Sequence, residues 1–134
     1  MTTAKLSVML IDDNKLDLFL CQKFIESVNI TKSITPFHSP VEALNFLKDN
    51  DVSTWPDLIV LDIQMPEMDG FEFLKECEQL KNFNKFKSHV IMVSSTLDFG
   101  DITRAKANSL VLDLLEKPLK IGNLVEILKY NAIL

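Results

Sequence analysis

The sequence predicts an α/β fold in which helices cover both faces of a parallel sheet. Stretches with helical spacing alternate along the chain with five short, mostly apolar segments, which are residues 6–11, 33–37, 57–62, 89–94 and 111–116. Three of these segments carry four or more consecutive apolar residues, as strands buried on both faces do. Because parallel strands joined through helices make right-handed crossovers, the five strand–helix repeats predict one continuous parallel sheet.

Helices are predicted where apolar residues recur three or four positions apart. Ser39 before Pro40 predicts one helix start, since serine caps helices and proline is favoured at the first helical position. Asp69 before Gly70 predicts another cap and a turn. The apolar stripes follow the first, second, third and fifth segments: Leu18, Cys21, Ile25 and Val28; Ala43, Phe46 and Leu47; Phe73, Leu74, Cys77 and Leu80; Ile121, Leu124, Val125 and Leu128.

Length, charge and apolar content limit the class of protein. We expect a single domain over residues 1–134, because this length suits one domain. The net charge is −5 without a local cluster of lysines and arginines, so we expect no nucleic-acid partner. No apolar run reaches the length of about 18 residues that a membrane span needs, so we expect no membrane partner. Cys21 and Cys77 lie among apolar residues, which favours reduced thiols and a cytoplasmic location.

Acidic side chains follow the first and third predicted strands. Asp12 and Asp13 come directly after residues 6–11, and Asp62 ends residues 57–62. Ligands of open parallel sheets bind outside the carboxyl ends of the strands, so we expect these carboxylates to meet at one edge. Adjacent carboxylates cannot be buried without a counter-charge. Three carboxylates without histidine or cysteine favour Mg²⁺ over zinc, and the sequence therefore predicts a Mg²⁺ site.

A hydroxyl and an ammonium group reach the same edge of the predicted sheet. Ser94 ends the fourth strand, and Lys117 follows the fifth, directly before Pro118. A divalent cation leaves the three carboxylates with one excess negative charge, which Lys117 can offset. A metal, a lysine and a hydroxyl together can neutralise and hold phosphoryl oxygens. Because a carboxylate can attack phosphorus and form an acyl phosphate, the residues predict a phosphoryl-transfer site.

These motifs, in this order, resemble the receiver domain of two-component response regulators. They are Asp12-Asp13, the segment LDIQMPEMDG that contains Asp62, VSS with Ser94, and Lys117-Pro118. The resemblance covers about residues 6–131 and is closest to stand-alone receivers of the chemotaxis type. It implies a flavodoxin-like (βα)5 three-layer sandwich with the strand order 2-1-3-4-5. It also implies that the bond between Lys117 and Pro118 is often cis.

The resemblance assigns the metal ligands. Asp13 would bind Mg²⁺ directly, and Asp12 would act largely through metal-bound water. Asp62 and the backbone carbonyl of Gln64 would complete the protein ligands.

The resemblance also implies how such a domain signals. Asp62 would accept a phosphoryl group from a phosphohistidine of a sensor histidine kinase or a His-phosphotransfer protein. Lys117 would pair with Asp62 and then with the phosphate, and Ser94 would move to donate a hydrogen bond to it. That movement would change the surface of the fourth helix, fifth strand and fifth helix, where a downstream protein would dock. The domain would be a switch that phosphorylates and dephosphorylates itself, and no metabolic enzyme.

Two features depart from the family's pattern. Leu114 stands three residues before Lys117, where receivers usually carry a tyrosine or phenylalanine whose ring turns inward. Leucine has no ring to close a pocket, so we expect a smaller surface change here. Gln64 and Thr96 occupy variable positions that influence the lifetime of the acyl phosphate in this family.

Three alternatives remain open. A phosphatase of the haloacid-dehalogenase type also uses an aspartate and Mg²⁺, but it needs a second aspartate where this chain has Gln64. A pseudo-receiver would bind partners without phosphorylation, and its support is Leu114 alone. The chain could also be a receiver fragment of a hybrid kinase or another phosphorelay protein.

Overall fold

The computed structural model describes residues 5–134, which contain one five-stranded sheet with the strand order β2-β1-β3-β4-β5. All neighbouring strands are parallel. The order and the directions confirm the predicted fold class. The strands are β1 (Leu6–Ile11), β2 (Thr31–Phe37), β3 (Leu58–Asp62), β4 (His89–Ser94) and β5 (Val111–Glu116).

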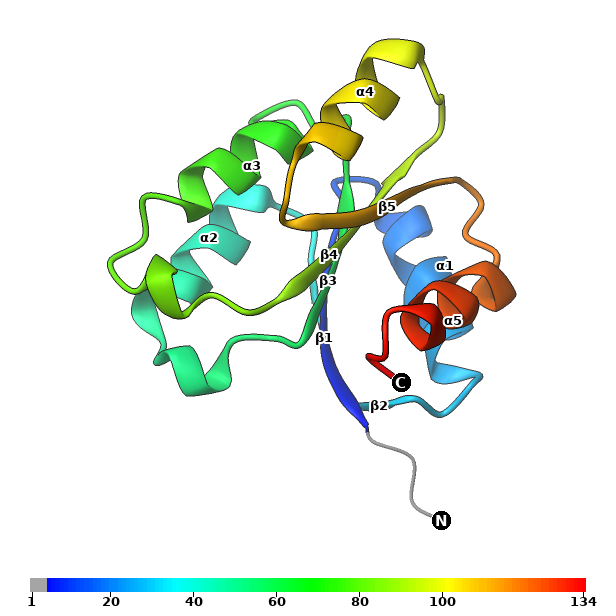
Figure 1. Ribbon diagram of the computed structural model, residues 1–134, viewed down its shortest axis with the longest axis horizontal. Coiled ribbons are helices and arrows are strands. Elements are labelled where there is room, and N and C mark those ends of the chain that lie inside the picture. The colour runs from blue at the N-terminus through cyan, green and yellow to red at the C-terminus, as the bar shows by residue number, and fades with distance from the viewer. Residues whose placement is uncertain (1–4) are drawn as a thin grey trace.

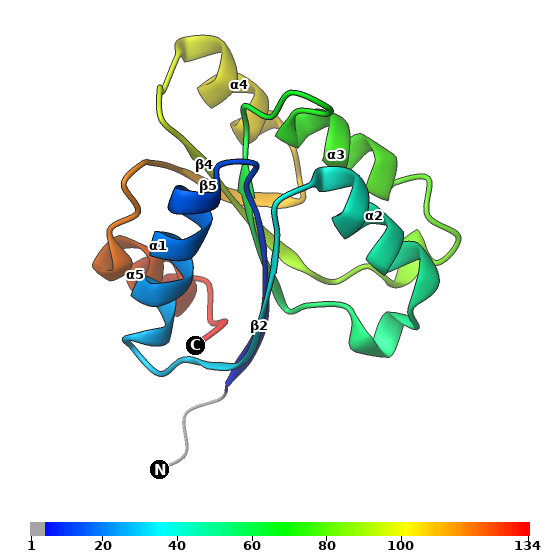
Figure 2. The same cartoon turned by 180° about the vertical axis from the view of Figure 1, so that it is seen from behind.

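The helices form two layers, one on each face of the sheet. Their bounds are α1 (Lys15–Glu26), α2 (Pro40–Asp49), α3 (Gly70–Cys77), α4 (Phe99–Ala107) and α5 (Ile121–Tyr130), with short 3-10 helices η1 (Val52–Thr54) and η2 (Phe83–Lys85). α1 and α5 cover one face, while α2, α3 and α4 lie on the other, as Figures 1 and 2 show. The result is the three-layer sandwich that the sequence predicts.

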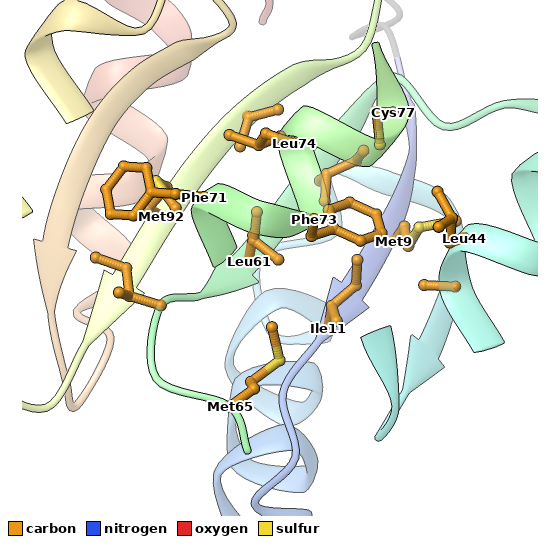
Figure 3. Close-up of a cluster of buried hydrophobic side chains, with 14 of the residues drawn as sticks. Met9, Ile11, Leu44, Leu61, Met65, Phe71, Phe73, Leu74, Cys77 and Met92 are labelled. Atoms are coloured by element: carbon orange, nitrogen blue, oxygen red, sulfur yellow. The ribbon is translucent and has the colours of Figure 1, made fainter. Parts of the chain in front are cut away.

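Buried strands supply both halves of the core because their side chains alternate between the two faces. Met9 and Ile11 of β1 belong to the cluster under α2 and α3. Val8 and Leu10, between them, belong to the cluster under α1 and α5. Figure 3 shows the first cluster, in which Phe73 of α3 lies beside β1. The sheet is therefore held rigidly from both sides, and so are the strand ends that carry polar residues.

Helices begin next to the carboxyl ends of the strands, and side chains cap them there. Asn14 caps α1 by accepting a hydrogen bond from the backbone N–H of Asp17. Ser39 caps α2 in the same way, with Pro40 at its first position, as predicted. Asp69 caps α3 in a reciprocal capping box, which confirms the predicted cap. These caps fix the loops that follow β1, β2 and β3.

Gly70 begins α3 where the helix touches the end of β3. A Cβ at this position would lie 2.7 Å from the carbonyl oxygen of Asp62 and 2.7 Å from Cε of Met92. The Gly70 N–H donates to the carbonyl oxygen of Ile63 at 2.8 Å. Only a residue without a side chain lets α3 start this close to β3, and the contact fixes the backbone around Asp62.

Two strands begin at other residues than predicted. β2 begins at Thr31 rather than at residue 33, and β3 begins at Leu58 rather than at residue 57. The bond between Lys117 and Pro118 is cis, as the resemblance implies. Among residues 5–134, none of the helices combines the length and the apolar character that crossing a membrane requires.

Candidate functional site

Three carboxylates meet at the carboxyl edge of the sheet. Asp12 follows β1 directly, and Asp62 is the last residue of the neighbouring strand β3. One oxygen from each of these residues and one from Asp13 all lie within 4.8 Å of one another. Asp12 and Asp62 are buried at 6% and 3% exposure, whereas Asp13 is open to solvent. The structure thus brings together the three acidic residues that the sequence places at strand ends.

Lys117 supplies the counter-charge. Its Nζ lies 2.8 Å from Oδ2 of Asp12 and 3.2 Å from Oδ1 of Asp62. Its backbone N–H donates to the carbonyl oxygen of Ser94 at 2.8 Å, which ties the loop after β5 to the end of β4. The other oxygen of Asp12 accepts a hydrogen bond from the N–H of Asn14 at 2.9 Å. Both buried carboxylates are therefore partnered, as buried charges must be.

A fourth carboxylate, Asp17, also contacts the lysine and was missed by the sequence analysis. The Lys117 ammonium donates to Oδ2 of Asp17 at 3.1 Å. Asp17 lies in the first turn of α1, and its side chain is 38% exposed. Its position four residues after Asp13 was the available signal, because α1 starts beside the strand ends and its first turn faces them.

The crowding of negative charge changes the acidity of the groups. Burial, followed by the charge of Asp12, raises the pKa of Asp62 to about 7, although Lys117 opposes the change. Burial also raises the pKa of Asp12, against its hydrogen bond to Lys117. Burial alone would lower the pKa of Lys117, but its hydrogen bond to Asp12 and the charges of Asp12 and Asp62 hold that pKa above its ordinary value. The ammonium therefore stays charged, but its single positive charge does not offset the negative charges of the carboxylates around it.

The donor set of this cluster fits Mg²⁺. Asp12, Asp13 and Asp62 offer hard oxygen atoms, and no histidine or cysteine belongs to the cluster found among residues 5–134. One lysine cannot balance three carboxylates, and a divalent cation adds the charge that is lacking. The side chain of Gln64 is hydrogen-bonded to Ser94 and to Asp101 of α4, and it does not belong to this cluster. The backbone carbonyl of Gln64 stays a predicted ligand.

Ser94 is fully buried beside the acidic cluster. Its hydroxyl forms hydrogen bonds with residues that do not belong to this cluster. Its Oγ lies 2.8 Å from Oε1 of Gln64 and also contacts the carbonyl oxygen of Thr96. The Gln64 side-chain amide donates in turn to Oδ2 of Asp101 in α4, at 3.4 Å. Ser94 thus connects the end of β4 with α4 through one glutamine.

Leu114 is half-buried in β5, opposite Met92 of β4, and packs against the core cluster under α2 and α3. Because Leu114 has no aromatic ring, the phenylalanines of the adjoining helices α3 and α4 are of interest. Phe99 is 84% exposed, at the start of α4. Phe71 is buried in α3, where the Arg104 guanidinium of α4 lies 4.0 Å from its ring centre.

Comparison with known proteins places this geometry in a family. Residues 8–129 match the family described as response regulator receiver domain. The structure of a response regulator receiver protein from Dyadobacter fermentans is 35% identical, with a TM-score of 0.81, and the match covers 92% of this chain and 95% of that one. A two-component response regulator from Cytophaga hutchinsonii is 33% identical, with a TM-score of 0.86 and coverage of 96% and 97%.

Similar sequences also occur inside larger proteins. Hybrid signal transduction histidine kinase B of Dictyostelium discoideum is 30% identical over 126 residues, which are 88% of this chain and 6% of the kinase. Protein-glutamate methylesterase/protein-glutamine glutaminase 1 of Cupriavidus metallidurans is 31% identical over 132 residues, which are 98% of this chain and 34% of that enzyme. The chain thus spans about a third or less of the length of these two relatives. From its matched residues, its strand order and its likeness to whole receiver structures, the chain belongs to the response regulator receiver domain family.

Proposed function

We propose that Asp62 of this domain accepts a phosphoryl group from a phosphohistidine, and that the domain signals by changing its affinity for a partner protein. The observation that carries the proposal is the Lys117 ammonium 3.2 Å from the Asp62 carboxylate, inside a cluster of three carboxylates. A lysine beside a buried carboxylate can pair with phosphoryl oxygens after transfer. The residues proposed to hold Mg²⁺ are Asp12, Asp13, Asp62 and Gln64 through its backbone carbonyl.

In the proposed reaction, an oxygen of Asp62 forms a bond to phosphorus while the bond between phosphorus and the histidine nitrogen breaks. The electron pair of that bond stays on the histidine nitrogen, which takes up a proton. Bound Mg²⁺ would neutralise charge on the phosphoryl oxygens. Because a carboxylate attacks only in its ionised form, Lys117 assists by opposing the raised pKa of Asp62.

The hydroxyl of Ser94 provides a route from the phosphate to the surface. To donate to a phosphoryl oxygen, it must leave its present partners, Gln64 and Thr96. Gln64 also donates to Asp101, so its release changes a contact with α4. We propose that the Gln64 side-chain amide takes over part of the switching role that an aromatic ring has in receivers that carry one. The result would be a changed surface on α4, β5 and α5.

A sensor histidine kinase or a His-phosphotransfer protein is the proposed donor. The start of α1 lies beside the acidic cluster and exposes Leu16 and Phe19, at 65% and 55%. Asn14 and Lys15 add polar groups to the same end of the helix. An apolar patch next to the reacting carboxylate suits a helical donor that must bring its histidine to Asp62.

Acetyl phosphate provides the decisive test. With Mg²⁺, the wild-type domain should gain the mass of one phosphoryl group in intact-protein mass spectrometry, and Asp62→Asn should gain none. Asp49→Asn is the matched control, because Asp49 is exposed at the end of α2, away from the acidic cluster, and this variant should be labelled normally. A wild type that takes up no phosphoryl group would overturn the proposal in favour of a pseudo-receiver. Continuous turnover of a small phosphate ester would instead favour a phosphatase.

A further inference from the structure

Asp17 shares the lysine of the site with Asp12 and Asp62. The three Lys117 contacts are of similar length, at 2.8, 3.1 and 3.2 Å for Asp12, Asp17 and Asp62. An ammonium group has three N–H donors, as many as the carboxylates that it contacts. Among residues 5–134, Lys117 is the one cationic group within ion-pair distance of the Asp17 carboxylate.

A phosphoryl group on Asp62 needs one of these donors. Asp12 is buried, with its side chain 8% exposed, and cannot be left without a counter-charge, whereas phosphorylated Asp62 carries its charge on the phosphoryl oxygens, to which the ammonium must turn. The Asp17 side chain is 38% exposed, so water can replace the lysine there at a small cost. Asp17 is therefore the partner that Lys117 releases most easily.

We propose that Asp17 is a positioning residue that holds the Lys117 ammonium in the unphosphorylated state and competes with the phosphoryl group for it, an inference that rests on the proposed function. Without phosphate, the ion pair keeps the lysine on the α1 side of the site. After transfer, the ammonium turns to the phosphoryl oxygens, and Asp17 is left to solvent as an added negative charge. Asp17 thus lowers the stability of the phosphorylated state relative to the free state.

Beryllofluoride, which mimics a phosphoryl group on aspartate, measures this competition. In the presence of saturating Mg²⁺, Asp17→Asn should tighten beryllofluoride binding about twofold to fivefold, as expected for a partly exposed ion pair. The dissociation constant would be read from a titration followed by NMR. Asp17→Glu should bind as wild type does, because the carboxylate is retained. Glu26→Gln removes the same charge from the exposed end of α1 and should leave the dissociation constant unchanged.

A double-mutant cycle separates the ion pair from a general effect of charge at the start of a helix. An acidic residue in the first turn stabilises a helix by itself, and that effect does not depend on Lys117. In metal-free protein, urea unfolding of Asp17→Asn, Lys117→Met and the double variant should reveal coupling worth about a threefold change in the unfolding constant. Lys117→Gln serves as a second variant if the methionine variant does not fold. In the complex with Mg²⁺ and beryllofluoride, the same coupling should vanish.

Each result decides for or against the role of Asp17. Zero coupling in the metal-free protein, or equal tightening by Glu26→Gln and Asp17→Asn, would overturn it. Unchanged or weaker beryllofluoride binding by Asp17→Asn would overturn it as well, while phosphorylation of Asp62 would stand. A wild-type domain that binds no beryllofluoride with Mg²⁺ would instead refute the proposed function, and the competition proposed for Asp17 with it.

Discussion

Replacing Asp62 with asparagine should stabilise the metal-free domain at neutral and alkaline pH. Burial and then the charge of Asp12 raise the pKa of Asp62 from 3.8 to about 7 in the folded state. Below pH 3.8 the carboxyl group is protonated in both states and contributes nothing. Between pH 3.8 and about 7 the unfolded chain loses this proton while the folded chain keeps it, so the free energy of unfolding falls as pH rises.

Above about pH 7, Asp62 is ionised in both the folded and the unfolded chain, and the free energy of unfolding has lost the full amount. At about 1.36 kcal/mol for each pH unit, this loss is at most about 4 kcal/mol. Asparagine has nearly the same size and cannot ionise, so Asp62→Asn removes this loss. The difference in the free energy of unfolding between this variant and the wild type should appear above about pH 4, grow towards about pH 7 and then stay constant.

Urea unfolding with a chelator, from about pH 4 to about pH 8, measures this advantage. The control variant Asp49→Asn lacks an exposed carboxylate and should follow the wild type at every pH. Saturating Mg²⁺ should remove most of the difference, because a cation that binds the folded wild type stabilises it by mass action. If Asp62→Asn is no more stable than the wild type at about pH 8, or if its advantage is independent of pH, the electrostatic reasoning is wrong.

Three further results are expected. Asp13→Ala should weaken Mg²⁺ binding about tenfold or more in calorimetry without unfolding the domain, since Asp13 is exposed; unchanged affinity would contradict its role as a ligand. Lys117→Ala, in Mg²⁺, should still fold and take up phosphate from acetyl phosphate, but phosphorylation should no longer shift the NMR signals of α4; normal shifts would remove Lys117 from the switch. Gly70→Ala should destabilise the domain by about 1–3 kcal/mol in thermal unfolding, because its Cβ would meet Asp62 and Met92. Gly122→Ala is the control, with open space around the added methyl group, and a similar loss there would refute the steric explanation.

The central strands could be predicted from sequence because they are buried on both faces. β1 and β4 start and end where their apolar runs do. The edge strand β2 was predicted two residues short, because Thr31 and Lys32 are polar, with Thr31 partly covered and Lys32 exposed. α4 produced no apolar stripe for a similar reason, since Ala105 is the buried residue within Phe99–Ala107. Apolar patterns in a sequence arise from buried side chains, and elements at the margin of the core have few of these, so their patterns are weak.

Most of the candidate site follows from the same logic. Parallel strands end at one edge, so polar residues at strand ends, such as Asp12, Asp62 and Ser94, must come together whatever the loops do. Asp17 could not be found in this way, because it comes from a helix and its distance to Lys117 depends on how α1 packs against the loop after β5. The Gln64 contact with Asp101 likewise depends on the position of α4, which no local pattern fixes.

The same weak burial makes α4 suited to transmit a change from Gln64, which it contacts through Asp101. Moving a helix with five buried residues, such as α3, would disrupt the core, whereas α4 has Ala105 buried and little else to lose. α4 also packs against β5, and its side-chain links to the segment after β3 and to α3 include the Gln64–Asp101 hydrogen bond and the Arg104 guanidinium over the Phe71 ring. A hydroxyl that leaves Gln64 for a phosphate alters the first of these links directly. In the proposed mechanism, a receiver with leucine at position 114 therefore couples its acidic site to this surface through the Gln64 amide, because the helix that must move buries one residue.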